Sequence, residues 1–141
     1  MTKDKFGRIA GYAMSGVVIA FMLLDGGMKL VPLDVVIKST AALGYPPSAD
    51  LARGLGIVAL LCTALYAFPR TSVLGAILLT AYMGGTVATH LRVGNPLFSH
   101  MLFGVYLAAL TWGGLYLRDA RIRALLPWNG SAASPSQTPG P

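Results

Sequence analysis

Two histidines and a few charged residues carry most of the chemistry open to this sequence. The histidines are His90 and His100, the two in the chain. Histidine titrates near neutral pH, so it can transfer protons or donate a hydrogen bond to a carbonyl oxygen such as that of a quinone. Two histidines and an aspartate could ligate a metal, and two histidines a haem. The ligand spacings Glu-x-x-His and His-x-x-x-His do not occur, so we expect no metal site.

Asp25 and Lys29 are spaced for an ion pair within one helix. They are four residues apart with the acid first, which is the favourable order. Asp25 could instead reach Arg53 on a neighbouring helix. Such charges either neutralise one another or reach lipid headgroups, or they line a polar pocket for a ligand or for protons. Both interpretations are open at this stage.

Several common chemistries are excluded by what the chain lacks. Cys62 is the single cysteine, so no dithiol can form within the chain. The sequence has no Gly-x-x-x-x-Gly-Lys-Ser/Thr phosphate loop, no carboxylate pair and no Ser/His/Asp order typical of hydrolases. We therefore assign no catalytic residue, and an enzyme acting alone is the less favoured interpretation.

The composition is that of a membrane protein. Of 141 residues, 55% are hydrophobic and only 11% are charged, against about 25% charged in an average soluble domain. So few polar residues cannot cover the surface of a small soluble protein. The net charge of +6 comes from basic residues scattered between apolar runs, which argues against nucleic-acid binding and makes the lipid bilayer the expected partner.

Four apolar segments predict an all-α fold, a bundle of four transmembrane helices running up and down. They cover residues 9–24 (extending to about 30), 51–68, 71–91 and 93–117. Each can approach the roughly 20 residues that a membrane-spanning helix requires. Residues 31–47 predict a short interfacial or re-entrant segment between the first two helices. We expect residues 1–128 to form a single membrane domain and 129–141, rich in Ser, Pro, Gly and Ala, to be a disordered tail.

Capping residues predict where three of the helices begin. Ser48 is a candidate N-cap for the second helix, and Thr71 or Ser72 for the third. Asn95 followed by Pro96 predicts the start of the fourth helix. The connection at residues 69–71 is so short that the helices on either side must be antiparallel neighbours.

The distribution of basic residues predicts the orientation in the membrane. Seven lie on the side of the termini and four on the other; the four are Lys29, Lys38, Arg53 and Arg92. Both termini are therefore expected in the cytoplasm. A cytoplasmic aromatic belt would then consist of Tyr66, Phe68, Trp112 and Tyr116. Six ionisable residues would meet at the non-cytoplasmic mouth of the bundle and form a polar pocket: Asp25, Lys29, Arg53, His90, Arg92 and His100.

Several motifs resemble the DoxX-like family of small bacterial membrane proteins. They are Asp25-Gly26-x-x-Lys29-Leu30, Leu43-Gly44-Tyr45-Pro46, residues 74–82, 88–94, 96–100 and 112–119. The resemblance covers about residues 9–126. It implies a four-helix protein of the bacterial inner membrane. The family is named after a subunit associated with a quinone-linked oxidoreductase, but most members have no assigned activity.

Three hypotheses for function follow from the residues and the resemblance together. The favoured one is an accessory or ligand-binding component of a membrane redox or stress-response system that contacts a quinone. The chain shows no flavin, haem or dithiol motif of its own, so electron transfer would need a membrane redox partner. The alternatives are a small-molecule transporter or ligand-binding homo-oligomer, and a purely structural or assembly protein.

Overall fold

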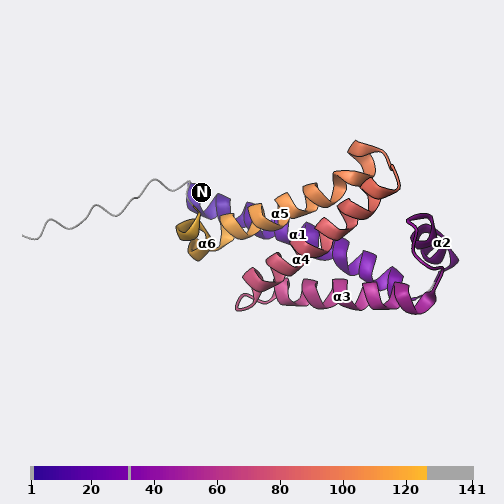
Figure 1. Ribbon diagram of the computed structural model, residues 1–141. Helices are drawn as coiled ribbons and strands as arrows, with labels where there is room; N and C mark the ends of the chain where they lie inside the picture. Colours follow the sequence, from indigo (N-terminus) through magenta and orange to yellow (C-terminus); the bar gives the residue numbers. More distant parts are fainter. Residues whose placement is uncertain (1, 32, 127–141) are drawn as a thin grey trace, which may run out of the picture.

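The computed structural model describes residues 2–31 and 33–126, and within these ranges the chain is helical without strands. Four helical spans are long and apolar enough to cross a membrane. They are α1 (Lys3–Leu30), α3 (Ala49–Ala67), α4 (Ser72–Arg92), and a last span composed of the π-helical turn η1 (Leu97–Met101) and α5 (Phe103–Arg118). The predicted fold class is confirmed (Figure 1).

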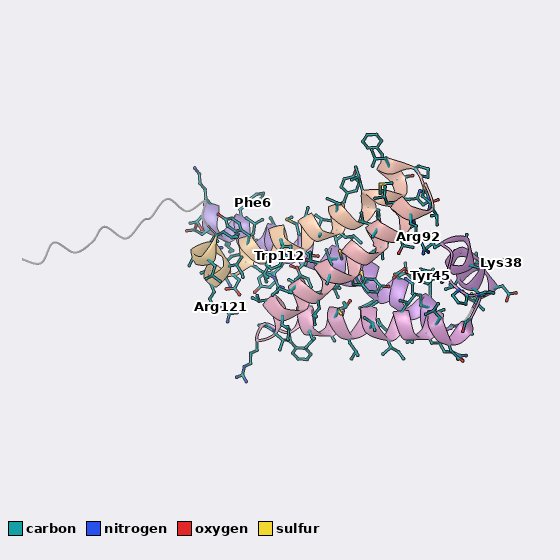
Figure 2. All side chains as sticks on the ribbon, in the orientation of Figure 1. Phe6, Lys38, Tyr45, Arg92, Trp112 and Arg121 are labelled. Atoms are coloured by element: carbon teal, nitrogen blue, oxygen red, sulfur yellow. The ribbon has the colours of Figure 1, made fainter. Side chains whose placement is uncertain are left out.

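Two short helices lie at opposite ends of the bundle. The helix α2 (Asp34–Ala42) follows α1, and α6 (Ala120–Leu125) follows α5 (Figure 1). We call the end with Lys3 and α6 the proximal end, and the end with α2 the distal end. Val36 and Thr40 of α2 are buried, whereas Lys38 points away from the bundle (Figure 2). The segment predicted between the first two helices therefore contains a helix packed on the distal end. The expected tail at 129–141 and its boundary lie outside the described residues.

The predicted helix starts are partly confirmed. The Ser48 hydroxyl accepts a hydrogen bond from the Leu51 amide at 3.3 Å, so Ser48 caps α3. Thr71 precedes α4 but donates its hydroxyl to the Leu65 carbonyl at 2.7 Å, which closes the turn without capping the helix. The Asn95 cap was wrong: residue 96 directly precedes η1, and the Asn95 side chain bonds to His90 instead. The fourth span thus begins at Leu97, after a turn in which Gly94 has a φ of +72°.

At the proximal end, glycines bring α1 close to α5 and α3 close to α4. A Cβ atom on Gly11 of α1 would lie 2.9 Å from the carbonyl oxygen of Gly114 on α5. A Cβ on Gly75 of α4 would lie 2.1 Å from the backbone nitrogen of Tyr66 on α3. No side chain fits at either contact, so these pairs of backbones touch.

At the distal end, glycines bring different partners together. A Cβ on Gly56 of α3 would lie 2.8 Å from the Gly26 carbonyl oxygen on α1, and a Cβ on Gly104 of α5 would lie 3.1 Å from the Met83 carbonyl oxygen on α4. The close pairs here are α1 with α3 and α4 with α5. The two pairs consequently separate toward the distal end, as Figure 1 shows.

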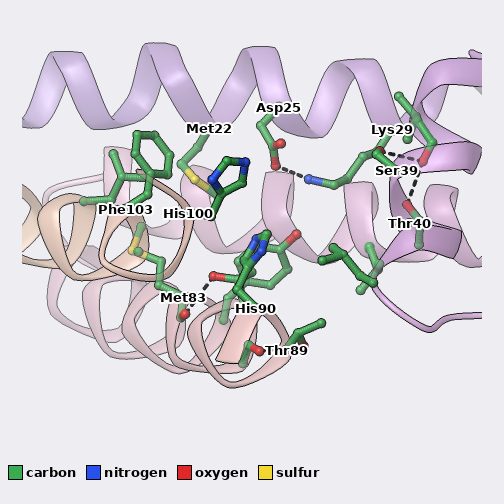
Figure 3. Close-up of a pocket in the computed structure, with 18 of the residues that line it drawn as sticks. Met22, Asp25, Lys29, Ser39, Thr40, Met83, Thr89, His90, His100 and Phe103 are labelled. Atoms are coloured by element: carbon green, nitrogen blue, oxygen red, sulfur yellow. Dashed lines mark hydrogen bonds and ion pairs between the residues drawn. The ribbon is translucent and has the colours of Figure 1, made fainter. Parts of the chain in front are cut away.

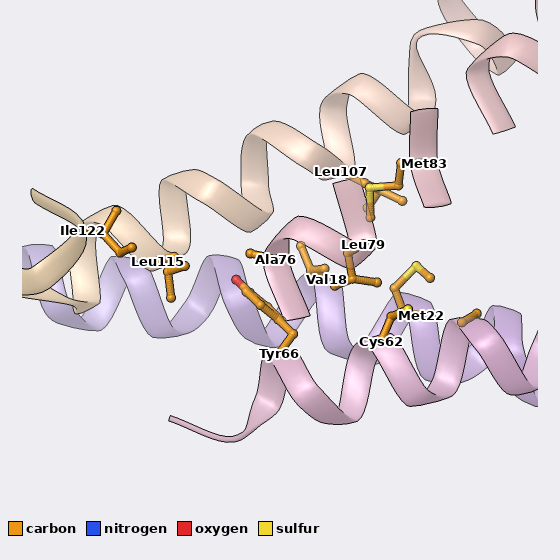
Figure 4. Packing of buried hydrophobic residues seen from close by; sticks show 11 residues of the cluster. Val18, Met22, Cys62, Tyr66, Ala76, Leu79, Met83, Leu107, Leu115 and Ile122 are labelled. Atoms are coloured by element: carbon orange, nitrogen blue, oxygen red, sulfur yellow. The ribbon is translucent and has the colours of Figure 1, made fainter. Parts of the chain in front are cut away.

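The buried core fills the middle and the proximal half of the bundle (Figure 4). Tyr66 has no exposed surface, contrary to its expected place in an aromatic belt. Its hydroxyl lies 2.9 Å from the Ser15 hydroxyl of α1 and donates to the Thr111 carbonyl of α5 at 2.9 Å. The Arg118 guanidinium carbon lies 5.2 Å from the centre of the Tyr66 ring. Tyr66 therefore links three helices from the inside of the protein.

Candidate functional site: a polar pocket at the distal end

A cavity of about 510 Å³ lies where the two helix pairs separate. Its walls come from α1, α2, α3, α4, η1 and α5 (Figure 3). Four of the six predicted residues line it: Asp25, Lys29, His90 and His100. The cavity exists because each helix pair is held together by its own glycine contact while the two pairs diverge. The helix α2 packs over it.

Asp25 and Lys29 form the ion pair that their spacing predicts. The Lys29 ammonium donates to the Asp25 carboxylate, and both side chains are mostly buried (Figure 3). Asp25 does not pair with Arg53. Arg53 bonds to Asp50 of its own helix at 3.2 Å, on an exposed surface, and does not line the pocket. The Asp25 and Lys29 charges thus neutralise one another inside the pocket wall.

The two histidines approach each other as predicted. Their ring centres are 5.8 Å apart, and the ring planes meet at 60°. The Asn95 side-chain nitrogen lies 2.7 Å from Nδ1 of His90, and the Ser99 hydroxyl lies 2.7 Å from Nδ1 of His100. Among the described residues, Nε2 of neither ring has a hydrogen-bond partner. Each ring is therefore held at one nitrogen and free at the other.

Arg92 contacts the segment that follows α2 and does not line the pocket. Its guanidinium donates to the Leu43 carbonyl at 2.9 Å, and the Tyr45 hydroxyl lies 3.1 Å from the Thr89 hydroxyl (Figure 2). Gly44 has a φ of +84°, and a Cβ there would lie 2.8 Å from the Arg92 guanidinium. Arg92 thus fastens the end of α2 to α4.

Further polar residues that were not predicted from the sequence also line the pocket. Tyr82 and Thr86 precede His90 on α4 at intervals of four residues, so the three share one helix face. This spacing was the signal that could have found them. Ser39 and Thr40 on α2 also contribute to the wall, but their sequence carries no comparable signal because their position depends on how α2 packs.

The inner wall of the pocket is apolar. Met22, Met83 and Leu107 belong to the buried core and also line the cavity. Phe21 of α1 and Phe103 of α5 meet edge to face beside them, with ring centres 5.0 Å apart. The pocket therefore joins a polar region to an apolar one, an arrangement suited to an amphipathic molecule.

The profile of the DoxX-like family matches residues 13–114. The chain belongs to the DoxX-like family. The match confirms the resemblance seen in the sequence motifs. It includes all four predicted residues that line the pocket. The comparison with curated proteins and the comparison with solved structures each returned no match.

Family membership and the four apolar spans together make this DoxX-like protein a multi-pass membrane protein. In the described part of the chain, no three His, Cys, Asp or Glu side chains are grouped to hold a metal ion. Cys62 is buried in the core, away from the pocket wall. The pocket of this DoxX-like protein offers hydrogen-bonding groups beside an apolar surface.

Proposed function

We propose that this DoxX-like protein binds a small, uncharged, amphipathic molecule in the distal pocket, with a quinone as the favoured ligand. It would serve a membrane redox or stress-response system as an accessory, ligand-binding component. The observation that carries this proposal is the pairing of two imidazole groups with an apolar inner wall in one cavity.

The charge of the pocket favours an uncharged ligand. Asp25 and Lys29 cancel each other, and both Arg53 and Arg92 bind elsewhere. An ionised ligand would lose its hydration without gaining a counter-charge, which is costly in a partly buried site. A quinone has two carbonyl oxygens for N–H donors and an apolar remainder.

The size of the cavity is also suitable. Its volume of about 510 Å³ falls within the roughly 300–1,000 Å³ typical of small-molecule sites. The apolar wall of Met22, Met83 and Leu107 offers a surface for the hydrocarbon part of a ligand.

The expected location is the bacterial inner membrane, with both termini in the cytoplasm and the pocket opening on the other side. The excess of Lys and Arg at the proximal end supports this orientation. A quinone bound in the pocket would exchange electrons only through a partner protein of the same membrane, and co-purification after cross-linking in membranes would identify that partner.

Photoaffinity labelling tests the proposal. The full chain in lipid nanodiscs is labelled with an azido-quinone in the presence and absence of excess decylubiquinone. We expect competed labelling in residues 21–29 and 81–107, and a strong loss of labelling in His90→Ala. Arg53→Ala is the matched control, because Arg53 lies outside the pocket, and its labelling should equal that of the parent. Labelling that is not competed, or that is equal in His90→Ala, contradicts the proposal.

A further inference from the structure

The turn between α4 and η1 supplies a partner for each pocket histidine. We propose that Asn95 and Ser99 are positioning residues that hold His90 and His100 in one tautomer, so that both Nε2–H groups face the pocket as a pair of donors. The pair would bind a headgroup that carries two acceptor oxygens. The ligand part of this inference rests on the proposed function, whereas the orientation of the rings can be tested without a ligand.

Asn95 determines the tautomer of His90. An amide nitrogen can only donate, so its 2.7 Å contact makes Nδ1 of His90 the acceptor. The proton of neutral His90 then resides on Nε2. Asn95 is itself held in place, because its backbone amide donates to the His90 carbonyl at 3.1 Å.

Ser99 makes the corresponding contact with His100. Its hydroxyl lies 2.7 Å from Nδ1 of His100 and can donate to it. His100 also lines the pocket, together with Phe103 and Leu107, which lie on the same side of the last span. Both rings therefore reach the cavity with their Nδ1 atoms already occupied.

The arrangement defines the class of headgroup. Two N–H donors on rings 5.8 Å apart match two oxygen acceptors on one small ring or chain better than a single acceptor. The apolar neighbours Met22 and Phe103 would contact the rest of the molecule. The ligand class is thus an uncharged carbonyl- or hydroxyl-bearing amphiphile.

Nitrogen NMR tests the positioning role directly. The protein is labelled with ¹⁵N-histidine in lipid nanodiscs, and its two histidines give only two sets of ring signals. At pH 8 we expect both rings as the Nε2–H tautomer. Asn95→Ala should shift His90 toward a mixture of tautomers and leave His100 unchanged, and Ser99→Ala should do the reverse. Arg53→Ala is the control and should alter neither ring.

Two results would overturn the positioning role: Nδ1–H tautomers in the parent protein, or unchanged tautomers in both alanine variants. If Asn95→Ala does not fold, Ser99→Ala and the conservative Ser99→Thr decide the question, since Thr should restore the tautomer that Ala loses.

Titration with ubiquinone-1 tests the donor pair. Both Nε2 signals should move on binding, and Asn95→Ala should weaken binding about tenfold, as expected for the loss of an oriented donor. If ubiquinone-1 binds and neither Nε2 signal moves, the donor pair is wrong although the protein binds quinone. If it does not bind at all and the tautomers are as expected, the quinone proposal fails and the positioning role stands.

Discussion

Arg92 of α4 donates to the carbonyl oxygen of Leu43, at the end of α2, over 2.9 Å. The two residues are 49 positions apart in the chain. The bond joins the end of α2, the helix that packs over the pocket, to α4. The Tyr45 hydroxyl, 3.1 Å from that of Thr89, adds a second link.

Replacing Arg92 with alanine should loosen α2 without unfolding the bundle. An exposed hydrogen bond of this kind contributes about 1 kcal/mol, so amide hydrogen exchange in residues 34–43 should accelerate about fivefold. Hydrogen exchange with mass spectrometry measures this in nanodiscs. Arg53→Ala, which removes another exposed arginine at the distal end, should leave exchange in α2 unchanged. If α2 exchanges equally fast in the two variants, Arg92 does not hold α2 against α4.

Removing the Tyr66 hydroxyl should destabilise the whole bundle. Tyr66→Phe leaves Ser15 and the Thr111 carbonyl without their buried partner, at an expected cost of about 1–3 kcal/mol. Equilibrium unfolding in mixed detergent micelles measures the loss. Tyr106→Phe is the matched control, because Tyr106 is 48% exposed on the outside of the bundle, and it should change stability little. A similar loss in both variants would contradict the internal role of Tyr66.

Gly75→Ala should disrupt the contact between α3 and α4. The new methyl group would lie 2.1 Å from the Tyr66 backbone nitrogen, and backbone atoms cannot move aside as a flexible side chain can. We expect a loss of about 3 kcal/mol or failure to fold. Gly84→Ala is the control: its methyl group meets open space on the same helix, and the higher helix propensity of alanine predicts an unchanged or slightly higher unfolding midpoint. If Gly75→Ala and Gly84→Ala are equally stable, the close contact between α3 and α4 at Gly75 is ruled out.

The net charge of the pocket should control which headgroup it prefers. Asp25→Asn leaves Lys29 without its partner, whereas Lys29→Gln leaves Asp25 alone. The first change should favour an anionic hydroxynaphthoquinone over neutral naphthoquinone, and the second should disfavour it, by about tenfold each. Competition against the azido-quinone label measures the ratio of the two naphthoquinone affinities in each variant. If this ratio changes in the same direction in both variants, the ion pair acts only on folding.

Acid should weaken the start of α6. Asp119 accepts from the Arg121 amide at 2.9 Å and pairs with the Arg121 guanidinium. The hydrogen bond from the Arg121 side chain lowers the pKa of Asp119 below its ordinary value. Because the folded-state pKa is the lower one, the stabilisation is complete above the ordinary pKa of about 3.9 and is lost as the pH falls through the folded-state pKa.

Hydrogen exchange in residues 121–125, or the ¹³C carboxyl shift of Asp119, follows this transition. The exchange rate, corrected for its intrinsic pH dependence, should rise only in strongly acidic solution. In Asp119→Asn the segment should exchange faster than in the parent at pH values above the transition, and its exchange should show no such transition. A pKa of Asp119 at or above its ordinary value would contradict the hydrogen bonding between Asp119 and Arg121.

The amino-acid sequence by itself predicted the four membrane-spanning helices and placed Asp25 and Lys29 on one helix face. Apolar runs of membrane-spanning length leave the chain no other way to satisfy its backbone hydrogen bonds in lipid. Side chains four residues apart in any α-helix lie on the same face. The sequence also predicted that Ser48 caps α3, since a helix cap involves only neighbouring residues.

The tertiary structure decided which of the remaining polar residues reach the pocket. Being near one end of a helix does not specify the direction in which a side chain points, because that depends on rotation about the helix axis. In this protein the rotation follows from close glycine contacts such as that between Gly26 and Gly56. These contacts leave Arg53 outside, bury Tyr66 at the centre and open the distal end around His90. They involve residues distant in the chain, and no local pattern encodes them.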